Sequence, residues 1–380
     1  MSFFFKAILT LLALILAGCQ AQSVGTPVFH AQGKPKTLSE WNLLIVQGHT
    51  LGLAKGMVAY DLNSPLFSDY AHKLRTVWLP EGSTASFHEI DTFDFPVGTI
   101  ISKTFYYPNN ADLASNKREV VKAADTTAER LLSGINLNDV KLIETRLLVH
   151  RQEGWVALPY VWNEQETEAV LKRTGDIKSL TLVDSKGKKD DFAYVVPNQN
   201  QCAGCHATNA TTREVRPIGL RARHLSKEYG YKSGSKSQLI AWSQMGILNN
   251  LPNPLPSKAN VRWNDLSQSL NDRARSYLDI NCSHCHNSVG PADTSGLLLE
   301  PADEHGPSLG LCKMPIAAGT GTGGRRYGIV PGKPDESIFT YRLESTLPSE
   351  MMPELGRSLS HTEGVDLVRS WIAQMDGSCN

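Results

Sequence analysis

Two short motifs in this chain combine paired cysteines with an adjacent histidine. Both follow the pattern Cys-x-x-Cys-His, and their residues are Cys202, Cys205 and His206 in the first copy and Cys282, Cys285 and His286 in the second. In this pattern both thiols form thioether bonds to the vinyl groups of a porphyrin, and the imidazole becomes the proximal ligand of its iron. The sequence therefore predicts two covalently bound haem c groups and electron chemistry.

Paired cysteines also occur in zinc sites and in disulfides. A zinc ribbon built from the two cysteine pairs needs neither histidine, and a disulfide needs none. The histidine that directly follows each pair favours haem attachment over both alternatives.

The first twenty residues indicate the compartment. Lys6 precedes an apolar run, residues 7–17, which is too short to span a bilayer comfortably and ends just before Cys19. This resembles a bacterial lipoprotein signal, in which residues 1–18 are removed and Cys19 is lipidated; an ordinary signal peptide with a chance cysteine is the alternative. Gln20 stands where aspartate marks inner-membrane retention in enteric-type bacteria. We therefore expect a periplasmic protein anchored by lipid to the outer membrane, and haem c is also attached outside the cytoplasm.

Two of the seven cysteines remain, Cys312 and Cys379. In an oxidising compartment they most simply pair, and the disulfide would tie the last residues of the chain to the loop after the second motif. Two free thiols, or Cys312 as a metal ligand beside Met314, are the alternatives.

The composition is that of a globular protein. The chain has 380 residues, 41% of them hydrophobic, with 38 lysines and arginines against 38 aspartates and glutamates. This length suits two or three domains, and the charge balance gives no indication of nucleic-acid binding. No later segment is apolar for long enough to cross a membrane. The expected partners are redox proteins, and a membrane through the N-terminal lipid alone.

The segment before the first motif is expected to be mainly β. After a polar tether over residues 19–36, residues 37–198 form a domain in which 94–107 and 141–150 have the alternation or apolar length of strands. Residues 155–162 extend the second run as a hairpin partner. A sandwich or a small barrel fits this pattern best.

Helices are expected elsewhere. The alanine-rich segment 110–132 indicates an inserted helix. Residues 199–260 carry the first haem motif, a helix over 238–248 and a proline-rich linker. Residues 261–380 form the second haem domain, whose first helix runs from about 265 into Cys282.

The last helix of that domain is amphipathic. Ser360 and Glu363 form a capping box, and apolar residues follow at helical spacing, namely Val368, Trp371, Ile372 and Met375. In a cytochrome c fold the first and last helices cross near the haem edge, and the axial methionine lies on the loop between them. The predicted fold class is therefore multidomain α+β, with a mainly-β, sandwich-like N-terminal domain followed by a mainly-α, cytochrome c-like haem region.

Met352 is the candidate distal ligand of the second haem. Its thioether is followed by Pro353, which stiffens the turn that presents the sulfur to iron. A buried core methionine is the alternative, and Met351 and Met314 are weaker ligand candidates. Arg342 is expected near the haem propionates or in a surface ion pair.

The first haem has several candidate distal ligands. His224 and Met245 follow His206 at distances along the chain that allow either to reach the iron. His88 or His150 of the β domain, or water, are the alternatives. An open iron would change the function.

Several segments together resemble a known family. They are residues 60–70, 95–98, 144–148, 197–202 and 281–286. They are similar to a bacterial dihaem c-type cytochrome family whose physiological role is unassigned, and residues 330–338 with Met352 and Pro353 resemble cytochrome c modules fused to bacterial oxidoreductases. The resemblance implies haem c binding and electron carriage at the six motif residues, and it supplies no substrate.

Three functions are compatible with these patterns. The favoured one is a dihaem electron-transfer lipoprotein, in which both irons have two protein ligands. The second is an enzyme, either peroxidase-like or an oxidoreductase whose β domain binds substrate, with His150, Glu153 or Glu164 as acid or base. The third is a haem-containing sensory or partner-binding module.

Overall fold

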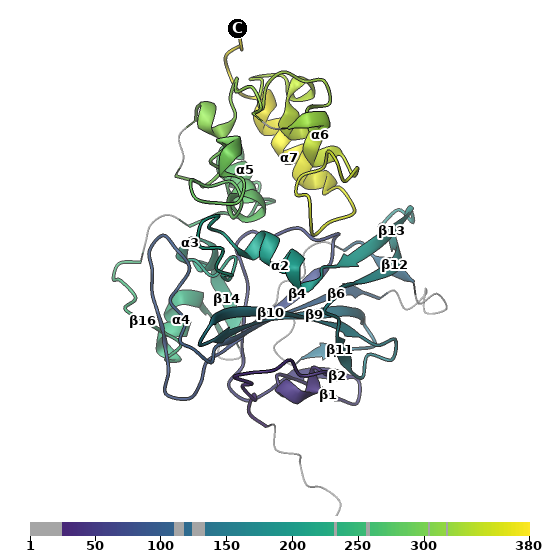
Figure 1. Ribbon diagram of the computed structural model, residues 1–380, viewed down its shortest axis with the longest axis vertical. Coiled ribbons are helices and arrows are strands. Elements are labelled where there is room, and N and C mark those ends of the chain that lie inside the picture. The colour runs from purple at the N-terminus through teal and green to yellow at the C-terminus, as the bar shows by residue number, and fades with distance from the viewer. Residues whose placement is uncertain are drawn as a thin grey trace, which may run out of the picture.

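The computed structural model describes residues 25–109, 118–123, 134–231, 234–255, 259–302, 305–316 and 318–380. Cys19 and the predicted signal peptide therefore lie outside the described residues. The fold is mixed, with a large mainly-β part and a smaller helical part (Figure 1). The strands of the large sheet are β3 (Val58–Tyr60), β4 (His72–Trp78), β6 (Ile100–Pro108), β9 (Val140–Arg151), β10 (Gly154–Trp162) and β11 (Ala169–Leu171).

This six-stranded antiparallel sheet has the order β11-β10-β9-β6-β4-β3. The predicted strands at 141–150 and 155–162 are β9 and β10, which form the expected hairpin. The strand predicted over 94–107 begins only at Ile100, because Gly98, at a φ of 99°, turns the chain just before it.

A small sheet covers one face of the large one. It consists of β1 (Leu44–Gln47), β2 (Thr50–Leu53) and β8 (Ile135–Asn136). Leu51 and Ile135 pack with Leu147 and Leu158 of the large sheet in one buried cluster. The mainly-β part is therefore built as a sandwich on this side.

A second small sheet extends the mainly-β part at its edge. It is formed by β13 (Lys189–Val196), β12 (Asp176–Val183) and β7 (Glu119–Val121). β7 lies within the segment 110–132 that was predicted to be a helix. The prediction is wrong for these residues, because Val120 is fully buried in a strand beside β12; residues 110–117 and 124–132 lie outside the described part.

The segment that begins with the first motif, residues 199–260, shares an apolar cluster with the large sheet. It contains α2 (Gln199–His206), α3 (Ala222–Leu225), β14 (Glu228–Tyr231), β15 (Gly234–Ser237), α4 (Gln238–Gln244) and β16 (Leu248–Asn249). Leu220, Trp242 and Leu248 are buried with Val77 and Ile101 of the large sheet. The segment thus packs on the face of the large sheet opposite to the small sheet β1-β2-β8.

The helix predicted over 238–248 is shorter than expected. It ends at Gln244, Gly246 follows at a φ of 74°, and Leu248 then pairs in parallel with β5 (Ala85–Ser86). Pairing with a strand that is distant in sequence stops the helix, and the local pattern carries no sign of it.

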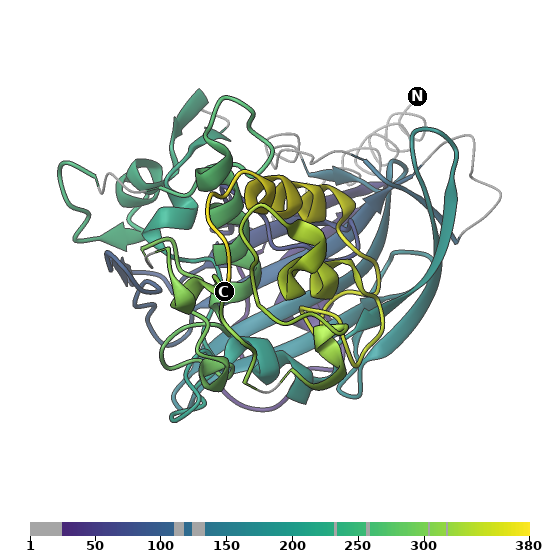
Figure 2. The same cartoon turned by 90° about the horizontal axis from the view of Figure 1, so that it is seen from above.

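Residues 261–380, called here the C-terminal part, have their own apolar core. They contain α5 (Leu270–Leu278), the π-helix η4 (Asp279–Ser283), α6 (Ile338–Glu344) and α7 (Thr362–Ala373), with short 3-10 turns between. α5 packs against α7 through Tyr277, Leu278, Val368 and Ile372. Seen from above, these helices lie in front of the strands of the large sheet (Figure 2).

Both helix starts differ from their predictions. α5 begins at Leu270, after the N-cap Ser269, rather than near residue 265. The predicted capping box at Ser360 is wrong, because the N-cap is His361 and no side chain caps the helix. Glu363 instead accepts a hydrogen bond from the Tyr70 hydroxyl, so tertiary contact replaces the local cap.

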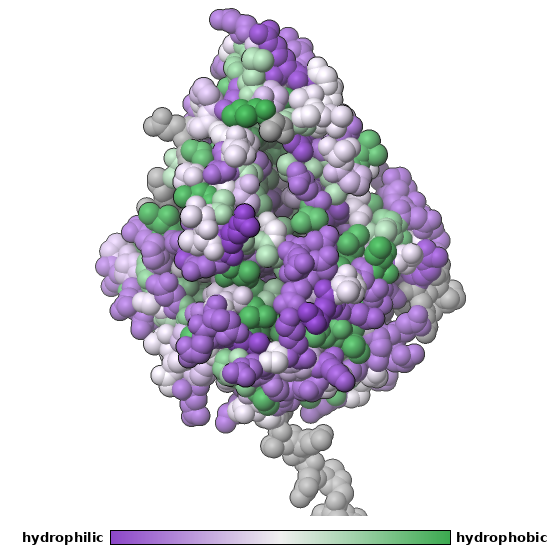
Figure 3. Space-filling view, viewed as in Figure 1, coloured by the Kyte–Doolittle hydropathy of each residue, from purple (hydrophilic) through white to green (hydrophobic). Residues whose placement is uncertain are grey.

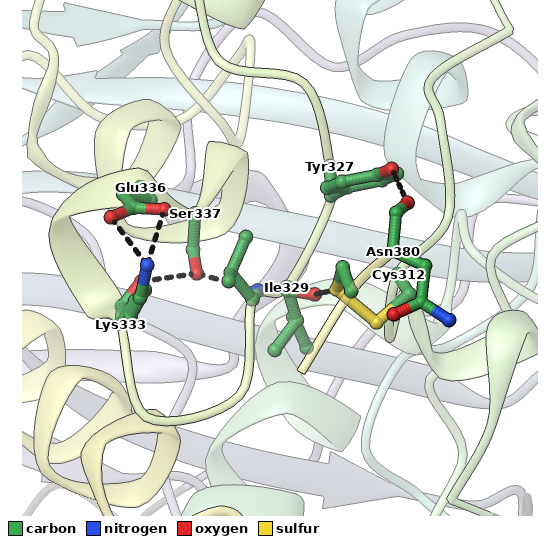
Figure 4. Close-up of a disulfide and its surroundings, with 9 residues drawn as sticks. Cys312, Tyr327, Ile329, Lys333, Glu336, Ser337 and Asn380 are labelled. Carbon is green, nitrogen blue, oxygen red and sulfur yellow. Dashed lines mark hydrogen bonds and ion pairs between the residues drawn. A yellow bond between two sulfur atoms is a disulfide. The ribbon is translucent and has the colours of Figure 1, made fainter. Parts of the chain in front are cut away.

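Cys312 and Cys379 form a disulfide, the pairing that the sequence analysis expected (Figure 4). Around it, the Tyr327 hydroxyl donates to the carbonyl of Asn380 at 2.6 Å. The bridge ties the end of the chain to the segment that also carries Ile329, whose carbonyl lies 3.8 Å from the sulfur of Cys379.

We predict that the double variant Cys312→Ala/Cys379→Ala is less stable to urea than the wild type. The bridge closes a loop of 67 residues in sequence, and its loss should lower the free energy of unfolding by about 2 to 4 kcal/mol. Urea unfolding with and without dithiothreitol measures this loss. The reductant should destabilise the wild type by breaking this bridge, and it should have no such effect on the variant, which lacks the bridge. Two free thiols at these positions in unreduced wild-type protein would contradict the pairing.

Candidate functional site

The first motif lies on α2, a helix with a reciprocal cap. The Asn198 side chain accepts from the backbone N–H of Gln201 at 2.8 Å, and the Gln201 side chain accepts from the backbone N–H of Asn198 at 2.9 Å. Cys202 is buried in the apolar cluster on the large sheet. The cap therefore fixes α2, and burial of Cys202 fixes which side of α2 faces the sheet.

His206 is held by one ring nitrogen. Its Nδ1 lies 2.7 Å from the carbonyl of Arg216, which can only accept, so Nδ1 carries the proton and Nε2 keeps a free lone pair. Burial, together with the charge of Lys103, lowers the pKa of His206 to about 3. The imidazole is therefore neutral, as an iron ligand must be.

The second motif begins inside the π-helix η4, which contains Cys282, and continues into the turn after it. Asn281 anchors this turn, because its Oδ1 accepts from the backbone N–H of Phe67 at 2.8 Å and its Nδ2 donates to the carbonyl of Tyr277 at 2.9 Å. π-helical turns of this kind often occur at functional sites. The motif is thus fixed both to its own helix and to the mainly-β part.

His286 is held in the same way as His206. Its Nδ1 lies 3.1 Å from the Ser295 hydroxyl, which itself donates to the carbonyl of Ala292 at 2.7 Å. Since the hydroxyl hydrogen is used there, Nδ1 is the donor and Nε2 keeps its lone pair. Burial, with the charge of Arg342, lowers the pKa of His286 to about 4.

The four motif cysteines are free thiols in the structure. Burial raises the pKa of Cys282 and of Cys285 to about 12, and it also raises the pKa values of Cys202 and Cys205. A redox-active dithiol needs the opposite, a thiol whose pKa is lowered by positive surroundings. The geometry thus disfavours a thiol–disulfide exchange site.

Three adjoining cavities lie along the two motifs. The first-motif cavity, of about 100 Å³, is lined by Cys202, Cys205 and His206. The second-motif cavity, of about 520 Å³, is lined by Cys282 and His286. The bridging cavity, of about 230 Å³, is lined by residues of both motifs. Figure 3 shows the molecule hollowed between the α5 side and the α6–α7 side of the C-terminal part.

Met352 lies where these cavities meet and lines all three. The two weaker candidates lie elsewhere: Met351 is buried away from the cavities, and Met314 is 59% exposed. Arg342 lines the second-motif cavity, beside His286, where it can reach a carboxylate. The structure thus brings the predicted ligand and the predicted arginine to the second motif.

The candidates for the first haem are not brought to its motif. His224 is buried in a polar cluster, with Nδ1 3.2 Å from the Asn260 amide and Nε2 3.5 Å from the Asp279 carboxylate. Met245 is the C-cap residue that follows α4, and it is 46% exposed. Neither lines any of the three cavities, so the structure does not bring these two predicted ligands to the first motif.

The two alternatives from the mainly-β part are also engaged elsewhere. His88 Nδ1 accepts from the backbone N–H of Asp91, and His150 Nδ1 lies 2.9 Å from the carbonyl of Phe95. The His150 ring stacks on Trp155. Neither histidine lines a cavity that contains motif residues.

Sequence reasoning missed four residues that line the first-motif cavity. They are His284, His361, Lys103 and Arg146. His284 is the variable residue before the second cysteine of the second motif, so its position was a usable signal. The two cations give no local signal, because only strand pairing brings them to α2.

A row of cations crosses the large sheet under the first motif. Arg75, Lys103 and Arg146 are register partners on three neighbouring strands. Arg75 pairs with Asp61 at 3.0 Å, and Arg146 pairs with the buried Glu144 at 2.5 Å. Burial lowers the pKa of Lys103 to about 7, and the two arginines add to this shift. In the described part of the chain, no hydrogen bond or ion pair reaches Lys103.

The residues present fit a haem at both motifs. Free thiols and a neutral histidine line the cavities at each motif. Lys103 and Arg146 at the first motif, and Arg342 at the second, could pair with the carboxylates of a haem. Within the described ranges, no cluster of three or more His, Cys, Asp or Glu side chains can hold a metal ion by itself. A haem iron needs only one or two protein ligands, because the porphyrin supplies the others.

Comparisons with protein-family models, with curated proteins and with solved structures found no match to this chain. None of the helices in the described ranges is both long enough and apolar enough to cross a bilayer.

Arg357 holds the turn that carries Met352. This arginine is buried, and its guanidinium donates to four backbone carbonyls, those of Leu359, Arg342, Ser345 and Met352. The bond to the Met352 carbonyl is 2.9 Å long. Because buried carbonyls need a hydrogen-bond donor, the Arg357 side chain satisfies all four of these acceptors and so fixes the path of the loop over the cavities.

We predict that Arg357→Met lowers the free energy of unfolding by about 2 to 4 kcal/mol, because buried carbonyls lose their charged donor. The control is Arg369→Met, which removes a half-exposed guanidinium paired with Asp335 and Glu344 and should cost less than about 1 kcal/mol. Urea denaturation of both variants measures the difference. Equal losses would show that Arg357 does not fix the loop.

Proposed function

We propose that this protein is an electron-transfer protein with two covalently attached haem c groups, one at each Cys-x-x-Cys-His motif. Cys202 and Cys205 hold the first haem, with His206 as its proximal ligand. Cys282 and Cys285 hold the second, with His286 as proximal ligand. The haem iron supplies the one-electron chemistry when bound, and the protein sets its ligands, surroundings and access.

One observation carries this proposal: each motif histidine is oriented by a hydrogen bond from its Nδ1. A hydrogen bond from Nδ1, to the Arg216 carbonyl for His206 and to the Ser295 hydroxyl for His286, leaves Nε2 as the ligating atom. Histidines that bind metals almost always donate their second ring N–H in this way. His206 ends a helix and His286 lies in a bend after η4, so the same orientation arises in two different local structures, and packing alone does not explain it.

The arrangement of the C-terminal part supports a cytochrome c-like module. The second motif follows α5, α5 packs against the terminal helix α7, and Met352 lies on the loop before α7. In a cytochrome c fold the first and last helices cross and the axial methionine comes from the loop between them. We therefore propose Met352 as distal ligand of the second haem and Arg342 as a propionate partner.

The position of the two motifs favours electron transfer over catalysis. Cys205 and Cys285 line the same bridging cavity, so electrons can pass between adjacent haems inside the protein. The acid and base candidates for a peroxidase, His150, Glu153 and Glu164, line none of the three cavities. The partners would be redox proteins of the bacterial periplasm, and a lipid on Cys19 would hold the protein at the outer membrane.

We predict that replacing both cysteines of either motif by alanine removes one of two haems. Mass spectrometry and haem staining of Cys202→Ala/Cys205→Ala and of Cys282→Ala/Cys285→Ala should each show a single covalent haem. The matched control, Cys312→Ala/Cys379→Ala, should keep both. If wild-type protein secreted with haem c maturation carries no covalent haem, the proposed function is wrong.

We predict that Met352→Ala keeps both haems but removes the iron–sulfur charge-transfer absorbance and lowers the midpoint potential of the second haem, since a methionine ligand raises it. The control is Met351→Ala, which truncates the neighbouring buried methionine and should cost about 2 to 5 kcal/mol of stability without changing the potential. Spectroelectrochemistry and thermal unfolding separate the two. An intact sulfur band in Met352→Ala would exclude it as ligand.

A further inference from the structure

The first haem lacks a distal ligand among the residues expected from the sequence, and the first-motif cavity contains one that suits this role. We infer that His284, inside the second motif, is the distal ligand of the first haem iron. The inference rests on the proposed function and deepens it, because one motif would then serve both haems.

His284 lies at the first-motif cavity and has an unpaired ring nitrogen that could bind iron. It is 8% exposed and lines both the first-motif cavity and the bridging cavity. Its Nδ1 is fully buried and has no hydrogen-bond partner in the part of the chain that the structure describes. Buried ring nitrogens normally have a partner. An unpaired one in the cavity that Cys205 and His206 also line indicates that its partner is a group bound there, such as a haem iron.

Other ligating groups at this cavity are committed elsewhere. His361 stacks on Phe67, with its Nδ1 3.1 Å from the Tyr277 hydroxyl and its Nε2 3.8 Å from Glu363. Met352 lines the cavity too, but it also lines the second-motif cavity, where it is the only described methionine or histidine besides His286 itself.

The two lysines at this cavity suit other roles. Lys73 donates to the carbonyl of Ala71 at 2.9 Å. Lys103 lies in the cation row between Arg75 and Arg146, a position that suits the carboxylates of a haem better than its iron. His284 is therefore the group whose surroundings leave it available.

The two different ligand sets predict the direction of electron transfer between the haems. The first haem would have two histidine ligands, His206 and His284, and the second would have His286 and Met352. A methionine ligand raises the reduction potential of a haem relative to a second histidine. One electron would then pass from the ferrous first haem to the ferric second haem, oxidising the first and reducing the second. Only Cys285 separates His284 from His286 along the chain.

Low-temperature EPR and near-infrared magnetic circular dichroism of the oxidised protein test this ligand set. We expect one bis-histidine haem and one histidine–methionine haem in the wild type. In His284→Ala, both haems should remain by mass, the first should become high-spin and bind cyanide, and added imidazole should restore the low-spin state. The control His361→Asn, at the same cavity, should keep both haems low-spin.

The outcomes separate this inference from the proposed function. A wild type without covalent haem overturns both. A wild type with two haems but no bis-histidine spectrum overturns the role of His284 alone, and this result does not depend on the folding of any variant. Two low-spin haems in His284→Ala, or a high-spin first haem in His361→Asn, would also overturn it.

Discussion

The site depends on the docking of the C-terminal part against the turn just before strand β4. The Asp69 carboxylate accepts hydrogen bonds from the backbone N–H groups of Ser358 and Leu359, at 2.7 to 3.0 Å. The N–H of Phe67 donates to Asn281, one residue before the second motif. These bonds join residues that are far apart in sequence, and they bring the second motif to the first, which is packed on the large sheet.

This docking encloses the first-motif cavity, which is lined by apolar side chains together with the cations Lys103 and Arg146. Burial holds His206 and His286 neutral, so both can act as ligands. The large sheet supplies positive charge near His206. Arg75 and Arg146 are neutralised by carboxylates, whereas among the described residues no carboxylate pairs with Lys103. A partly buried cation without a partner is costly, so we propose that a carboxylate of the proposed first haem faces Lys103. With a haem bound at the first motif as proposed, the sheet would contribute to its electrostatics as well as to its support.

Much of the local structure could be predicted from the sequence, and the reasons are physical. Alternating runs at 141–150 and 155–162 are adjacent in the chain, so their pairing as β9 and β10 follows from local pattern. The helix at 238–248 was overestimated because Leu248 pairs with a strand more than a hundred residues away. Residues 110–132 had helical composition, yet Val120 lies in a sheet, where burial outweighs propensity.

The candidate site shows the same division. The motif residues and Met352 are recognisable by spacing, since their chemistry requires fixed neighbours along the chain. The surroundings of the first motif are assembled from strands and loops that are remote in sequence, so His224 and Met245 were chosen by chain distance, whereas His284 lines the cavity.

The most direct test of a coupled haem pair is EPR of the mature protein at two potentials. In the fully oxidised state, we predict low-spin signals broadened or split by interaction between the irons. At a potential where only the second haem is reduced, the simple spectrum of one isolated low-spin haem should appear. An oxidised spectrum that is the sum of two independent haem signals would contradict the placement of both haems along adjoining cavities.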